Sequence, residues 1–176
     1  MKGTKQLAFC GIISAISVAL MFISGIFSFL SYAIPGICGA LLIMVIINIS
    51  KSKSFLIYIV VCTLSLLIVA NKTSVLAYIL LLGYYPILKF FIENIENKFF
   101  EFTLKLLVFL VSLVLFLVIA YFFVGLDLLF SLGPIILSII LFSLILMFFL
   151  YDFCLSLFIE YYKNVLKPKF FKNFFK

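Results

Sequence analysis

The chain has 176 residues, of which 68% are hydrophobic and only 11% are charged, and its mean hydropathy is +1.45. Ordinary soluble domains carry about a quarter charged residues, so this chain lacks the polar groups that a water-facing surface needs. Its net charge is +7, and it contains no His, Arg or Trp. A soluble enzyme, a nucleic-acid-binding domain and a disordered chain are excluded, and we expect lipid to cover most of the surface.

Charged residues, glycines and prolines divide the chain into six apolar segments. The segments cover residues 7–30, 35–49, 54–70, 74–92, 103–124 and 134–158. Each is near the roughly 20 residues that span a bilayer core as a helix, although the second and third are short. The first is too long for the apolar core of a signal peptide, so we interpret it as an anchor. The sequence predicts an all-α integral membrane protein, a bundle of six transmembrane helices within residues 1–162.

The lysines are distributed unevenly between the two ends of these segments. If the termini and alternate connections share one side, that side holds every lysine except Lys72. Loops on the cytoplasmic side carry the excess of positive charge. The sequence therefore predicts six spans with both termini in the cytoplasm of a bacterial plasma membrane. In a five-span alternative, the third and fourth segments would form a re-entrant hairpin. That arrangement would distribute the lysines over both sides of the membrane.

Residues 163–176 are predicted to form a basic amphipathic tail in the cytoplasm. Five apolar side chains gather toward one side of a helix that would begin at Pro168: Leu166, Phe170, Phe171, Phe174 and Phe175. The lysines of this segment lie mostly on the other sides: Lys169, Lys172 and Lys176. This pattern favours a segment that lies on the anionic inner membrane surface. The alternative is a frayed tail.

The first segment carries two stripes of small residues at helical spacing. One stripe contains Cys10, Ser14, Ser17, Met21, Ser24 and Ser28. The other contains Gly11, Ala15 and Ala19. Small residues four apart let two helix backbones approach closely in lipid. Two such faces suggest two packing partners, with the serine stripe facing the protein's own bundle and the Gly/Ala stripe docking on another membrane protein. The alternative, which the frequency of such patterns in membrane helices favours, is that both stripes pack inside the bundle.

The fourth segment is expected to bend, because Gly83 and Pro86 lie inside it. Four polar residues fall near one face of this helix: Ser74, Tyr78, Tyr85 and Lys89. They suggest the polar wall of a cavity. The alternative, which we favour for Lys89, is an interfacial tyrosine belt with the lysine extending to water.

Few acidic residues are available for chemistry. Asp127 falls in an outer connection, and Asp152 is placed near the inner interface, too shallow for a proton relay. Glu93, Glu96 and Glu101 are expected in a solvated inner loop. Without His, no Ser/His/Asp, Cys/His or HExxH constellation can form, and no P-loop occurs. We therefore expect no enzyme activity, cofactor or metal, and any energy from ATP must come from another protein.

The chain resembles the substrate-binding S component of energy-coupling-factor vitamin transporters in three features. These are six predicted spans, cytoplasmic termini and the stripe of Ala15 and Ala19, which Gly11 extends. The resemblance implies that this stripe docks on a transmembrane coupling subunit that works with two ATPases. It also implies a solute site near the outer face, for which the candidate residues are Ser28, Tyr32, Asn71, Lys72 and Tyr78. The outer connections are shorter than is usual in that family. The region from Asn71 to Lys89 also resembles small, functionally unassigned membrane proteins of Gram-positive bacteria.

Two functions of different classes follow from these patterns. The first is a membrane subunit that binds a small, rather apolar solute for uptake, energised by separate ATPase subunits through a coupling protein. The second is a non-transporting membrane scaffold, such as a subunit of the cell-elongation or envelope-synthesis machinery. In both cases the lipid bilayer is a partner and nucleic acid is not.

Overall fold

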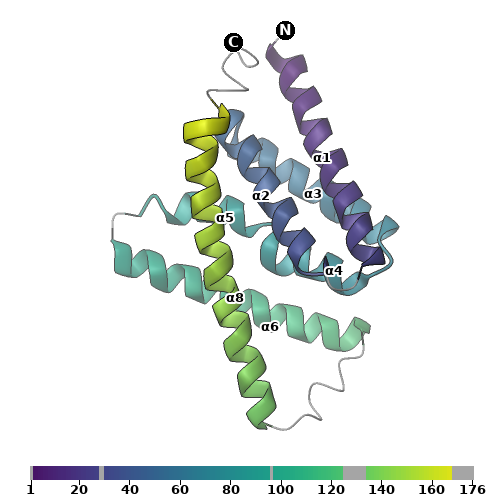
Figure 1. Ribbon diagram of the computed structural model, residues 1–176, viewed down its shortest axis with the longest axis vertical. Coiled ribbons are helices and arrows are strands. Elements are labelled where there is room, and N and C mark those ends of the chain that lie inside the picture. Colours follow the sequence, from purple (N-terminus) through teal and green to yellow (C-terminus); the bar gives the residue numbers. More distant parts are fainter. Residues whose placement is uncertain (1, 28–29, 96, 125–133, 168–176) are drawn as a thin grey trace.

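The computed structural model describes residues 2–27, 30–95, 97–124 and 134–167. These residues are almost entirely helical and contain no β-strand, which confirms the predicted all-α class (Figure 1). The elements are α1 (Lys2–Ile26), α2 (Ala33–Asn48), α3 (Lys51–Ile68), α4 (Lys72–Ala77), the π-helical η2 (Tyr78–Leu82), α5 (Tyr85–Ile92), α6 (Lys98–Val124), α8 (Pro134–Tyr161) and the π-helical η3 (Tyr162–Leu166).

Five helical stretches are long and apolar enough to cross a membrane. They are Gly3–Ile26, Lys51–Ile68, Lys72–Ile92, Lys98–Ile119 and Phe142–Leu166. The third combines α4, η2 and α5. The remaining predicted span, α2, has 16 residues and is about 24 Å long at 1.5 Å per residue, shorter than a bilayer core of about 30 Å. The chain is thus consistent with a multi-pass membrane protein.

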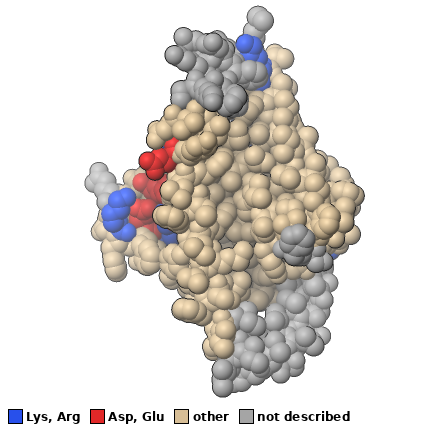
Figure 2. Space-filling view, viewed as in Figure 1, with Lys and Arg blue, Asp and Glu red and all other residues tan. Residues whose placement is uncertain are grey.

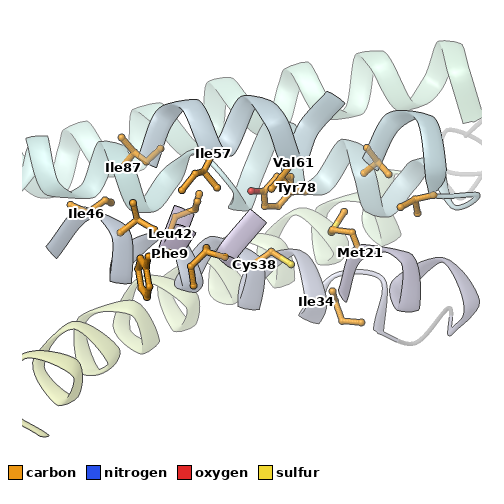
Figure 3. Close-up of a cluster of buried hydrophobic side chains, with 14 residues drawn as sticks. Phe9, Met21, Ile34, Cys38, Leu42, Ile46, Ile57, Val61, Tyr78 and Ile87 are labelled. Carbon is orange, nitrogen blue, oxygen red and sulfur yellow. The ribbon is translucent and has the colours of Figure 1, made fainter. Parts of the chain in front are cut away.

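α2 lies at the centre of the bundle and packs against α1, α3, the broken α4–η2–α5 helix and α8. It is apolar all round, as expected of a helix that is covered on several sides. Leu42 and Cys38 are fully buried in a cluster that side chains from α1, α3 and η2 complete, among them Met21, Val61 and Tyr78 (Figure 3).

Helix ends that are distant in sequence meet at one end of the bundle. Lys53 Nζ at the start of α3 donates to Gln6 Oε1 of α1 at 2.7 Å. Asn48 at the end of α2 donates to the Tyr162 hydroxyl in η3. The starts of α1 and α3 and the ends of α2 and α8–η3 therefore share one end, where they appear together in Figure 1.

α6 and α8 cross steeply (Figure 1). α6 packs chiefly against α4, η2 and α5, and α8 packs against α2. Both expose large apolar side chains, including Phe99 and Phe122 on α6 and Phe142 and Phe153 on α8. So much exposed apolar surface is suited to lipid and unsuited to water.

Candidate functional site

The third spanning stretch is broken at η2, as the sequence predicts. The Gly83 amide donates to the Tyr78 carbonyl, five residues back, at 2.8 Å. The Ile79 carbonyl therefore loses its α-helical donor. Pro86 has no N–H, so the Leu82 carbonyl four residues before it loses its donor as well. Breaks of this kind in membrane helices often line functional sites.

Two tyrosines from neighbouring helices satisfy these two carbonyls. The Tyr58 hydroxyl of α3 donates to the Ile79 carbonyl at 2.7 Å. The Tyr151 hydroxyl of α8 donates to the Leu82 carbonyl at 2.9 Å. An unpaired carbonyl away from water costs several kcal/mol, so broken helices persist in membranes only where such partners exist. The break is thus held from both sides by α3 and α8.

Tyr151→Phe should lower the free energy of unfolding by about 1–3 kcal/mol, because it leaves the buried Leu82 carbonyl unpaired. In a Pro86→Ala background the same substitution should cost less, since the restored amide at position 86 can donate to that carbonyl. Equilibrium unfolding in mixed micelles measures both values. Tyr161→Phe, at an exposed tyrosine of α8, is the matched control. An equal cost with and without the proline would contradict this account of the break.

A buried lysine links α5 to α8 near the end of the broken helix. Lys89 is fully buried. Its Nζ donates to the Asp152 carboxylate, to the Asp152 backbone carbonyl at 2.9 Å and to Ser156 Oγ at 2.8 Å. It also lies 3.2 Å from Glu93 Oε1. The expectation that Lys89 extends to water is wrong: its ammonium is held by oxygen atoms inside the protein. Ser74, Tyr78 and Tyr85, on the same predicted face, are also buried.

A second lysine, Lys105 of α6, completes an ion-pair network among three helices. Its Nζ lies 2.9 Å from Glu101 Oε1, 3.3 Å from Glu93 Oε1 and 3.4 Å from Asp152 Oδ2. The Tyr85 hydroxyl donates to Asp152 Oδ1 at 2.6 Å. Figure 2 shows acidic and basic side chains gathered beside the start of α6, on a face that carries few other charges. Glu101 is buried, so its expected place in a solvated loop is also wrong.

The charges of the network are paired with one another across three helices. Each carboxylate of Glu93, Glu101 and Asp152 is paired with a lysine ammonium, so none is a free base. Within the described ranges, no group of three or more His, Cys, Asp or Glu side chains could hold a metal ion. The sequence signal for this network is a single charge inside each of three apolar segments: Lys89, Lys105 and Asp152. A charge inside a membrane segment usually has a partner with a functional or structural role.

The predicted outer residues Asn71 and Lys72 serve as helix caps. Asn71 Oδ1 accepts from the Thr73 amide at 3.1 Å at the start of α4, and Asn71 Nδ2 donates to Ser31 Oγ at 3.0 Å. Lys72 Nζ donates to the Val69 carbonyl at 2.9 Å at the end of α3. These contacts join the α1–α2 and α3–α4 connections at the end of the bundle opposite Lys53.

Among the described residues, the other predicted solute contacts Tyr32 and Tyr78 have different surroundings. Ser28 and Asp127 lie outside the described residues, as does most of the predicted tail. Tyr32 lines an apolar groove of about 390 Å³ between α2 and α8, together with Tyr151. The hydroxyl of Tyr78, the first residue of η2, is buried and has no hydrogen-bond partner among the described residues.

The two stripes of α1 lie on different faces. Ser17, Met21 and Ser24 are buried against the bundle. Gly11, Ala15 and Ala19 are exposed and line an open groove of about 690 Å³ that Leu64 of α3 borders. Here the helix backbone is accessible to another helix, as close packing in lipid requires.

No family model, curated protein or solved structure matches the chain.

Proposed function

We propose that the chain is a membrane subunit that binds a small solute for uptake, with energy supplied by separate ATPase subunits through a coupling protein. It crosses the bacterial plasma membrane six times with both termini in the cytoplasm. α2, the second helix in chain order, is the span that brings the total from five to six. Neighbouring helices surround it, so its short length need not match the thickness of the lipid bilayer. The lysines at the starts of α1 and α3 support this orientation, with Lys72 at the other end.

The groove of Gly11, Ala15 and Ala19 on α1 carries the proposal. The stripe is exposed and lines an open groove. A partner helix laid in this groove gains backbone contacts and dispersion energy that bulky side chains would prevent. The coupling protein is the occupant that the resemblance to S components implies. The break at η2 supports solute binding, since broken spans with backbone groups at membrane depth are typical of transport sites.

Affinity purification from native membranes, followed by mass spectrometry, tests this function. The wild-type chain should recover a membrane coupling protein together with ATPase subunits. Ala15→Trp should remove most of that recovery, because the indole fills the groove. Ile16→Trp is the matched control: Ile16 is exposed on the neighbouring face of α1, outside the groove, so the partners should remain. A folded wild type that recovers no ATPase would overturn the proposal.

A non-transporting membrane scaffold is the second candidate. It is favoured by the use of Asn71 and Lys72 as caps, which leaves few free polar groups among the described residues at that end of the bundle. Recovery of envelope-synthesis proteins in place of ATPases, lost on Ala15→Trp, would support the scaffold and reject the uptake function.

A further inference from the structure

A third groove lies beside the helix break, between α3, η2 and α6. It has a volume of about 380 Å³, within the usual range of roughly 300–1,000 Å³ for small-molecule sites. Its polar lining consists of the hydroxyl groups of Tyr58, Tyr84 and Ser112, and the rest of the lining is aliphatic. No charged side chain lines it among the described residues.

The positions of the hydroxyl hydrogens can be assigned by counting donors. Ser112 Oγ donates its single hydrogen to the Val108 carbonyl at 2.8 Å. In the hydrogen bond between Tyr84 and Ser112, the phenol must then be the donor. Tyr58 donates its hydrogen to the Ile79 carbonyl at 2.7 Å. Both phenol oxygens have therefore used their hydrogens and keep lone pairs, so in this groove they can act only as acceptors.

We propose that this groove binds a small uncharged solute with an apolar body and one N–H or O–H donor. The assignment rests on the proposed function, because it names the class of solute that the subunit takes up. A charged solute is disfavoured, since burying a charge without a partner is costly. A lipid acyl chain, or a solute that has only hydrogen-bond acceptors, offers no N–H or O–H group to the phenol oxygens. Sites built to form a hydrogen bond discriminate strongly against analogues that cannot form it.

Indole and 1-methylindole form a matched pair of probes, because they share an apolar ring system and only indole has an N–H. The chain contains no Trp, so indole fluorescence can be followed without a tryptophan background. Titration of the full chain in lipid nanodiscs, with empty nanodiscs subtracted for partitioning, should give saturable indole binding. 1-Methylindole should bind about tenfold more weakly, as the loss of one buried hydrogen bond predicts.

Two pairs of variants locate the site. Val111→Phe should fill the groove and abolish indole binding, whereas Val114→Phe, at an exposed α6 valine outside the groove, should leave binding unchanged. Both side chains are exposed, so neither substitution disturbs the core. Tyr84→Phe removes one acceptor and should reduce the preference for indole over 1-methylindole. Leu110→Phe, an exposed α6 position that does not line the groove, should keep that preference.

Equal binding of the two probes, or indole binding that survives Val111→Phe, would overturn the assignment. The outcome is separable from that of the affinity purification. ATPase recovery without indole binding rejects the solute class and leaves the proposed function standing. Saturable, N–H-dependent indole binding without ATPase recovery supports the groove as a binding site and rejects the uptake function.

Discussion

Lys89→Met is expected to lower the free energy of unfolding by about 3–5 kcal/mol, because breaking a buried ion pair leaves the partner charge uncompensated. The Lys89 ammonium is fully buried and donates hydrogen bonds to the Asp152 carboxylate, the Asp152 backbone carbonyl and the Ser156 hydroxyl. Its removal also leaves Lys105 as the remaining cation beside Glu93 and Asp152. Equilibrium unfolding in mixed micelles, at several salt concentrations, measures the loss.

Two further variants decide whether the loss reflects the buried pair. Adding Asp152→Leu to Lys89→Met should recover part of the stability, since replacing both charges with apolar groups removes the uncompensated charge. Lys98→Met is the control, because Lys98 pairs with Glu101 while its side chain is 84% exposed; such surface pairs are worth about 0–1 kcal/mol. If Lys89→Met were as mild as Lys98→Met, the network would not hold α5 to α8.

Gly39→Ala should destabilise the protein by about 1–3 kcal/mol or more through overpacking. A Cβ atom at Gly39 would lie 2.5 Å from the Tyr151 hydroxyl and 2.6 Å from the Leu82 carbonyl oxygen. These two atoms form the hydrogen bond that closes the helix break. One added methyl group therefore forces α2 away from both α8 and η2, and thermal unfolding should show a lower Tm.

Gly11→Ala is the matched control for this substitution. Gly11 is also inside a helix, but a Cβ atom there would meet nothing within 4 Å. The change should raise stability by roughly 0.5–1 kcal/mol, since alanine has the higher helix propensity. A Tm for Gly39→Ala equal to that of Gly11→Ala would show that α2 is not packed tightly against Tyr151.

The helices themselves could be predicted from apolar segments, with errors at their charged ends. The second segment, predicted at 35–49, is Ala33–Asn48 in the structure, but the third begins at Lys51 and the fifth at Lys98, several residues before the predicted starts. The prediction placed charged residues in the loops. Lysines at a helix end can extend to the interface while their backbone remains helical, so charge marks such boundaries only approximately.

The candidate site could be predicted only in part, because its contacts join distant segments. Pro86 shows from sequence that the Leu82 carbonyl loses its donor, yet nothing local identifies Tyr151 as the replacement. In the same way, Lys89 and Asp152 each stand out as a charge in an apolar segment, but their pairing depends on how α5 lies against α8. Sequence alone therefore indicates that partners are needed and does not identify them.

Cysteine labelling in intact cells tests most directly the claim of six spans with both termini in the cytoplasm. Cys10, Cys38, Cys62 and Cys154 are first replaced with Ser, and single cysteines are then placed at the exposed positions Lys72, Lys98 and Lys163. A charged maleimide that does not cross membranes should label Lys72→Cys from outside. It should label Lys98→Cys and Lys163→Cys only after permeabilisation. Labelling of Lys163→Cys from outside intact cells would contradict the six-span topology.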